Sequence, residues 1–162
     1  MERNLKGMMT KMDVRNQIVM SQVMMPHHAN ALGIVHGGEV MKFMDTAAAA
    51  VAMRYAKADC VTARVDEMNF HFPVHVGDLV VCTASIVYVG RTSIEVLVTV
   101  NSENLKSEEN AKVALSAYFT MVCIDENGQP QQVKPYTPQT DDEKTLYERA
   151  KAYIDRKKAL RK

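Results

Sequence analysis

Residues 30 to 45 read Asn30-Ala-Leu-Gly-Ile-Val-His-Gly-Gly-Glu-Val-Met-Lys-Phe-Met-Asp45. The paired glycines, Gly37 and Gly38, are poor residues for a helix interior but suit a helix start. Apolar and small side chains then continue at helical spacing, so we expect a helix from about residue 38 to residue 57. Its alanine run, residues 47 to 50, keeps one side thin and permits close approach to a sheet or to a second subunit.

One aspartate stands inside this apolar helix. Asp45 has Met41 four residues before it and Ala49 four residues after it, so helical spacing turns it toward side chains expected to be buried. A buried carboxylate must gain hydrogen bonds or shift its pKa, and enzymes keep general bases in such settings. The alternative is a helix that turns Asp45 to water, since Lys42 and Arg54 indicate that a polar face exists. We favour Asp45 as a candidate catalytic group.

The glycine pair supplies a second part of this candidate site. At a helix start, backbone N–H groups lack partners and the helix dipole favours negative charge. Because they have no side chains, Gly37 and Gly38 let another molecule approach these donors. A carbonyl oxygen on the Gly38 amide would leave its carbon near the turn from which Asp45 projects, which predicts an oxyanion site beside a base. The alternative is a tight strand-to-helix turn without a ligand.

Strand patterns dominate most of the remaining chain. Apolar runs separated by proline, glycine and polar stretches predict strands at about residues 14–24, 60–72, 78–89, 92–103 and 111–124. One long helix followed by a run of antiparallel strands is typical of the α+β class.

A second helical pattern ends the chain. Thr140-Asp-Asp-Glu143 has the spacing of a capping box. The apolar residues that follow recur at helical spacing and predict a helix packed on the domain surface or on a neighbouring subunit: Leu146, Ala150, Tyr153 and Ile154. The basic end, residues 156–158 with Arg161 and Lys162, could meet a nucleotide phosphate, but we favour an unpaired, solvated tail.

Composition argues against several other classes of protein. The 162 residues suit one domain, and 47% hydrophobic residues allow a core without membrane-spanning runs. A net charge of +1 argues against nucleic-acid binding by bulk electrostatics. Cys60, Cys82 and Cys123 are odd in number and lack Cys-x-x-Cys spacing, which argues against a disulfide scaffold or a zinc site. In the absence of a signal-peptide pattern, we expect a cytoplasmic protein with no membrane partner.

Several ordered motifs carry a resemblance to a known family. The first comprises Asn30, Gly33, Gly37, Gly38, Met41, Met44 and Asp45, and further matches lie at residues 61–70, 76–78 and 90–93. Together they resemble the hotdog-fold acyl-CoA thioesterases, in particular the group containing the bacterial short- and medium-chain acyl-CoA hydrolases and the brain acyl-CoA hydrolase. The resemblance covers about residues 12 to 135. His36 occupies a position where some members carry phenylalanine, so we do not expect it to be catalytic.

The resemblance implies an α+β hotdog fold, an antiparallel sheet wrapped around one long central helix. The domain would span residues 14–135, with an N-terminal tail at 1–13 and a C-terminal helical extension at 136–162. It implies hydrolysis of acyl-CoA to free fatty acid and coenzyme A. Because coenzyme A is part of the substrate and is itself a product, no separate cofactor is expected. Asp45 would be the general base or the nucleophile, the Gly38 amide the oxyanion donor, and Asn30 would come from the opposite subunit of a homodimer. The resemblance further suggests a trimer of dimers, which is a hexamer.

Further substrate contacts are implied in the same way. Coenzyme A would meet Arg91, Thr92 and Ser93, where a guanidinium fork and two hydroxyl groups suit phosphate. The alternative for this segment is a simple hairpin turn. Gly37 would border the bound thioester, and the apolar wall would include Phe70, Met41 and Met44, for which core packing is the alternative.

Two other functions and a metal site are alternatives to hydrolysis. Hydratases of the same fold carry aspartate with histidine five residues later, as Asp66 and His71 do, but an odd separation in a strand sends side chains to opposite faces. A non-catalytic acyl-CoA sensor would need a DNA-binding module, and too few residues precede position 14 to supply one. His71 and His75 lie four residues apart around Pro73 without a Cys-x-x-Cys or helical His pattern beside them, so we expect no metal.

Overall fold

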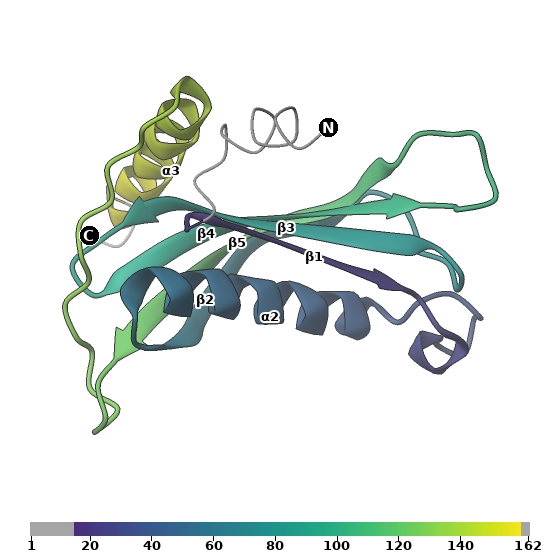
Figure 1. Ribbon diagram of the computed structural model, residues 1–162, viewed down its shortest axis with the longest axis horizontal. Coiled ribbons are helices and arrows are strands. Elements are labelled where there is room, and N and C mark those ends of the chain that lie inside the picture. The colour runs from purple at the N-terminus through teal and green to yellow at the C-terminus, as the bar shows by residue number, and fades with distance from the viewer. Residues whose placement is uncertain (1–14, 160–162) are drawn as a thin grey trace, which may run out of the picture.

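The computed structural model describes residues 15–159, which form one antiparallel sheet with a helix on each of its faces (Figure 1). The five strands are β1 (Gln17–Val23), β2 (Asp59–Phe70), β3 (Leu79–Val89), β4 (Ser93–Glu103) and β5 (Lys112–Ile124). Their order across the sheet is β1-β3-β4-β5-β2. The strands β1 and β2 therefore form the two edges, although they come first in the chain. The predicted N-terminal tail lies outside the described residues.

The long helix is α2 (Gly37–Ala56), which begins at the glycine pair as predicted. His36 is its N-cap residue, and Lys57 ends it in the left-handed region at φ 55°. The alanine run does bring the helix close to the sheet, since Ala47 and Ala48 are completely buried. A 3₁₀ turn, η2 (Pro26–His28), lies between β1 and α2.

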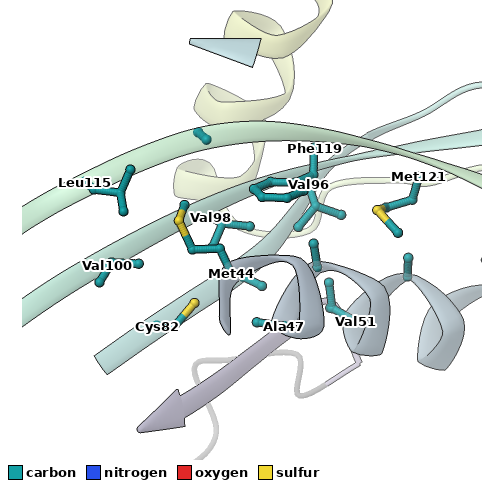
Figure 2. Packing of buried hydrophobic residues seen from close by; sticks show 14 of the residues in the cluster. Met44, Ala47, Val51, Cys82, Val96, Val98, Val100, Leu115, Phe119 and Met121 are labelled. Atoms are coloured by element: carbon teal, nitrogen blue, oxygen red, sulfur yellow. The ribbon is translucent and has the colours of Figure 1, made fainter. Parts of the chain in front are cut away.

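The hydrophobic core lies between α2 and one face of the sheet (Figure 2). From α2 it receives Met44, Ala47 and Val51, which face side chains from the central strands: Cys82, Val96, Val98, Val100, Leu115, Phe119 and Met121. Burial of such apolar surface is the main favourable term in folding. Met44 is fully buried in this core, so within one protomer it cannot line a substrate pocket. For Met44 the alternative, core packing, is correct.

The second helix, α3 (Asp141–Ala159), covers the opposite face of the sheet (Figure 1). The predicted capping box is confirmed, because the Glu143 amide donates to Thr140 Oγ1 at 3.1 Å and the Thr140 amide donates to Glu143 Oε2 at 3.0 Å. Aromatic pairs join this helix to the sheet, with ring centroids 5.3 Å apart for Tyr118 and Tyr153 and 5.5 Å apart for Tyr88 and Tyr147. The predicted surface packing of α3 is therefore on its own domain.

The prediction of an unpaired basic tail is wrong for two of its residues. Lys157 Nζ lies 2.8 Å from Asp66 Oδ1, and Arg156 Nη2 lies 3.9 Å from Glu67 Oε1. The helical pattern alone did not indicate that α3 would pass over acidic residues of β2. Arg161 and Lys162 lie outside the described residues.

The edge strand β2 is irregular. Its register with β5 shifts between Thr62 and Arg64 and again between Asp66 and Asn69, and Glu67 has a positive φ of 55°. Such bulges insert an extra residue and re-aim the side chains around it.

Candidate functional site

Asp45 projects from α2 toward the edge strand β2, at the rim of the hydrophobic core. The Thr62 hydroxyl donates a hydrogen bond to Asp45 Oδ1 at 2.5 Å, and the same hydroxyl lies 3.5 Å from the Met121 sulfur. Asp45 is half-buried and Thr62 is exposed, so the expectation of a lone carboxylate on a dry face is only partly correct. This hydrogen bond fixes the orientation of the carboxylate toward β2. Thr62 is a site residue that the sequence analysis missed.

The helix start carries the second group of predicted residues. The Gly38 amide donates to His36 Nδ1 at 2.9 Å, so the expectation that this amide lacks a partner is wrong. His36 caps the helix with its ring, a role that is common for Ser, Thr, Asp or Asn and was not expected here. Among the described residues, the Gly37 amide has no hydrogen-bond acceptor. One free donor and one capped donor therefore lie at the positive end of α2.

Two aromatic rings explain why both positions are glycine. A side-chain carbon built on Gly37 would lie 3.2 Å from Phe70 Cζ, and one built on Gly38 would lie 3.0 Å from His36 Nδ1. The glycine pair thus lies between the rings of His36 and Phe70. Phe70 is 49% exposed, and this places an apolar, accessible surface beside the helix start.

Asp45 and the glycine pair share one side of α2. Seven residues separate Gly38 from Asp45, which corresponds to nearly two turns and a rise of about 10 Å. Met41 lies between them and is 42% exposed. An open surface with a carboxylate at one end and amide donors at the other is therefore lined by Met41 and Phe70. The structure brings these predicted residues together.

Asn30 lies in the loop before α2 and adopts a turn. Its Oδ1 accepts a hydrogen bond from the Leu32 amide at 2.9 Å, and its carbonyl accepts one from the Gly33 amide at 3.0 Å. Gly33 has a φ of +76°, which explains the glycine at this position of the motif. Leu32 at the tip of the turn is 82% exposed. The side chain of Asn30 thus shapes a protruding loop in the single protomer.

The segment Arg91, Thr92 and Ser93 lies on the other side of the sheet. It forms the tight connection between β3 and β4, closed by a hydrogen bond from the Gly90 amide to the Ser93 carbonyl at 2.8 Å. The hairpin interpretation is therefore correct as a description of the local structure. Arg91 is exposed and lines a pocket of about 290 Å³ beneath α3, whose other lining residues are Arg64, Tyr88, Gly90, Ser93, Glu95, Ile154 and Lys157. This pocket does not meet Asp45 within one protomer.

That pocket contains an acidic group with an unusual environment. Glu95 is 7% exposed. The Thr120 hydroxyl donates to its carboxylate and lies 2.9 Å from both carboxylate oxygens. Burial raises the pKa of Glu95, although Thr120 and Arg64 act in the opposite direction. The three cations that surround it, Arg64, Arg91 and Lys157, make the pocket suited to an anion.

Strand alternation does not separate Asp66 from His71, contrary to the expectation from the sequence. The bulge after Asp66 breaks strict alternation, so the odd separation does not by itself send Asp66 and His71 to opposite faces. The two residues are nevertheless separated, because Asp66 pairs with Tyr118 while the His71 amide bonds to Ala114, four positions farther along β5. Asp66 is also held by Arg64 at 2.6 Å and by Lys157.

Within residues 15–159, no group of three or more His, Cys, Asp or Glu side chains is arranged to hold a metal ion. Neither helix of that described range is long and apolar enough to cross a membrane.

Comparison with known proteins gives consistent results. The family model of the thioesterase superfamily matches residues 32–108. Helicobacter pylori protein VdlD is 40% identical over 136 residues, covering 84% of this chain and 77% of that protein. An uncharacterised acyl-CoA thioester hydrolase of Zymomonas mobilis is 42% identical, covering 70% of this chain and 75% of that protein. The cytosolic acyl coenzyme A thioester hydrolase of Mus musculus is 34% identical over 84% of this chain, which is 36% of the mouse protein.

Solved structures agree with these relatives. An apo-hexameric acyl-CoA thioesterase has a TM-score of 0.84 and 36% identity, with 90% of this chain and 93% of that chain covered. The Staphylococcus aureus acyl-CoA hydrolase, solved with butyryl coenzyme A and coenzyme A, has a TM-score of 0.81 and 31% identity, with 90% and 88% covered.

Three solved variants of the Staphylococcus aureus enzyme replace an asparagine, an aspartate or a threonine with alanine. In that enzyme the aspartate follows the asparagine by 15 residues, and the threonine follows the aspartate by 17. Asn30, Asp45 and Thr62 have the same spacing. With relatives that match over most of their length and an architecture shared with solved acyl-CoA hydrolases, the chain belongs to the hotdog-fold acyl-CoA thioester hydrolases of the thioesterase superfamily.

Proposed function

We propose that this enzyme hydrolyses acyl-CoA to a free fatty acid and coenzyme A, with the chemistry at Asp45. The observation that carries the proposal is the Asp45 carboxylate, held by the Thr62 hydroxyl at 2.5 Å on the side of α2 that leads to the glycine pair. Support also comes from the spacing shared with the substituted positions of the Staphylococcus aureus enzyme. We also propose a cytoplasmic location, with the cytosolic mouse relative as support.

The reaction uses groups that this chain provides. Asp45 takes a proton from water, the water oxygen attacks the thioester carbonyl carbon, and the carbonyl oxygen becomes an oxyanion. Collapse of this intermediate breaks the carbon–sulfur bond, and the thiolate of coenzyme A receives a proton. In the alternative, Asp45 attacks the carbonyl itself and forms an anhydride that water then opens. No separate cofactor takes part in either version.

The oxyanion is received by amides at the start of α2. The Gly38 amide is the proposed donor, and the free Gly37 amide beside it can add a second hydrogen bond. Because His36 Nδ1 accepts from Gly38 in the free enzyme, the ring must turn away when the carbonyl oxygen arrives. The His36 ring therefore competes with the substrate for one donor.

A complete site requires more than one copy of the chain. We propose that two copies pair along β2. No strand lies beside its outer edge among residues 15–159, and Val61 and Val65 on this strand are 47% and 39% exposed. Asn30 of the second copy would then reach the Asp45 site. Three such dimers would make a homohexamer, and the hexameric thioesterases among the solved structures support this assembly.

The remaining contacts divide the substrate between two regions. Met41 and Phe70 would line the thioester and acyl portion, since both are accessible beside the helix start. Arg91, with Thr92 and Ser93, would bind a phosphate of coenzyme A in the cationic pocket. Because that pocket and Asp45 lie on opposite faces of one sheet, the proposal includes a neighbouring copy that supplies Arg91.

The test is release of free thiol from acyl-CoA esters of graded chain length and from a truncated thioester that lacks the nucleotide. We expect turnover of at least one acyl-CoA, and we expect Arg91→Ala to raise KM for acyl-CoA while sparing the truncated substrate. Lys106→Ala, which removes an exposed cation in the loop between β4 and β5, is the matched control. Binding of acyl-CoA without turnover of any ester would instead indicate a sensor.

A further inference from the structure

Two cysteine thiols lie against each other near the candidate site. Cys60 of β2 is directly opposite Cys123 of β5, and their Sγ atoms are 3.0 Å apart. Both residues are unbridged and buried, with 9% of Cys60 and none of Cys123 exposed. No local sequence pattern indicates this pair, because 63 residues separate its members.

The backbone around the pair suits a cross-strand bond. The Cys123 amide donates to the Thr92 carbonyl at 3.0 Å, and the Cys123 carbonyl accepts from the Gln131 amide at 2.9 Å. Both backbone groups therefore point away from β2, which makes Cys60 and Cys123 a non-hydrogen-bonded pair. Such pairs have Cα atoms about 4.5 Å apart, within the range of about 4.4–6.8 Å seen in disulfides.

The pair lies just beneath the surface of the protein. Cys123 forms part of the wall of a surface pocket of about 440 Å³, whose other lining residues include Lys57, Asp59 and Gln131. Cys60 retains a small exposed area of its own. The third cysteine, Cys82, is completely buried in the core beneath α2.

We propose that Cys60 and Cys123 form a reversible disulfide and that this bond lowers turnover at Asp45. With a peroxide as oxidant, the Cys60 sulfur attacks one peroxide oxygen to give a sulfenic acid and one water. The Cys123 sulfur then attacks Cys60 and releases the second water. Two thiols are oxidised by two electrons, one peroxide is reduced, and an external dithiol reverses the reaction by exchange.

The coupling follows from the short distance along β2. Thr62, whose hydroxyl holds Asp45, is two residues from Cys60 and lies on the same face of the strand, opposite Met121. A disulfide must shorten the present separation of 3.0 Å to about 2.05 Å, which draws this end of β2 toward β5. Because misplacement by about 1 Å can reduce catalysis by about a hundredfold, we expect oxidation to lower kcat by about tenfold or more.

The first measurement is the intact mass of the assembled enzyme after exposure to hydrogen peroxide, followed by peptide mapping without reduction. Burial raises the pKa of both thiols, so their oxidation is expected to be slow at neutral pH and faster as the pH rises. The expected product has lost two hydrogen atoms and contains one peptide pair, Cys60 with Cys123. Absence of this pair at every pH tested would overturn the proposal.

The second measurement is thiol-ester turnover before oxidation, after oxidation, and after treatment with dithiothreitol. Wild type and Cys82→Ala should lose activity and regain it, while Cys60→Ala and Cys60→Ser should keep their starting activity throughout. A disulfide without loss of turnover overturns the coupling. The activity measurement rests on the proposed function, but the mass measurement does not, so the two failures are distinguishable. If the alanine variant does not fold, the serine variant and the peptide map of the wild type still test whether the disulfide forms and lowers turnover.

Discussion

The two faces of the sheet hold their helices by different means. Between α2 and the sheet, the contacts are almost entirely aliphatic, aromatic or thioether groups (Figure 2). Between α3 and the sheet, stacked tyrosines alternate with charged groups, including the buried Glu95 and the pair formed by Asp66 and Lys157. The difference indicates that the α2 face provides stability and fixes the position of Asp45 at its rim. The α3 face provides polar attachment and a pocket for anions.

The largest effect is expected on turnover at the α2 face. Asp45→Asn retains the shape of the side chain but removes the base or nucleophile, so kcat should fall by at least about a hundredfold. Thiol release is the measurement, and the thermal unfolding midpoint should change little. Glu39→Gln, on the same helix and paired with Lys42 at the surface, is the control. Near-normal kcat in the Asp45 variant would remove this residue from the mechanism.

Adjacent residues of β5 test the contrast between the faces directly. Phe119 is 1% exposed and faces α2, whereas Tyr118 is half-buried and stacks on Tyr153 of α3. We expect Phe119→Ala to lower the free energy of unfolding by about 3–5 kcal/mol, because it leaves a cavity in the core. Tyr118→Ala should cost less. Urea unfolding of both variants gives the comparison, and equal losses would show that the two faces contribute alike.

A smaller effect on turnover is expected from Thr62, the hydrogen-bond partner of Asp45. Thr62→Ala removes the hydrogen bond to Asp45, and such bonds to charged groups are worth about 1.5–3 kcal/mol. We therefore expect kcat to fall by about tenfold to a hundredfold. Thr62→Ser keeps the hydroxyl and should restore most of the activity. If serine were as defective as alanine, the methyl group rather than the hydroxyl would matter.

The smallest effect concerns the charged attachment of α3. Burial alone would raise the pKa of Asp66, but the hydrogen bond from Lys157 and the nearby Arg64 more than offset it and hold the pKa below its ordinary value. A depressed carboxyl pKa contributes stability above the unfolded value of about 3.9, and this contribution is lost as the pH falls through the folded value.

Lys157→Ala should therefore lower the free energy of unfolding only slightly at neutral pH, and the loss should shrink below about pH 4. Urea unfolding at both pH values is the measurement. Lys144→Ala removes an exposed pair with Asp141 on the same helix and serves as the control. A cost that grows on acidification would contradict the assignment.

The sequence predicted regular structure well where local signals act alone. The helix start at Gly37, the strand positions and the capping box at Thr140 each depend on a few neighbouring residues. Each lies within about two residues of its predicted place, except the start of β1, which was predicted at residue 14 and lies at Gln17. The sequence could also predict that Asp45 and the glycine pair share one side of the helix, since all three residues lie on α2.

Features that depend on contacts between distant segments were missed. The bulges of β2 alter which residues face α3, and no local sequence pattern predicts these bulges. Thr62 reaches Asp45 only because β2 lies beside α2, and Lys157 meets Asp66 across 91 residues. The sequence indicates no role for the His36 side chain. In the folded helix start its ring accepts the hydrogen bond of the Gly38 amide.

The order of strands has a consequence for how the chain acquires its structure. Both edge strands are made early but find their partners late, since Gln17 of β1 pairs with Ser85 and Asp59 of β2 pairs with Ile124. During synthesis the apolar side of α2 is complete before any sheet exists to receive it. The hairpin of β3 and β4 is the earliest long antiparallel unit, and β5 must join it before β2 can dock. Such non-local pairing slows folding and prolongs the exposure of apolar surface, so the newly made chain is most vulnerable to aggregation until residue 124 has emerged.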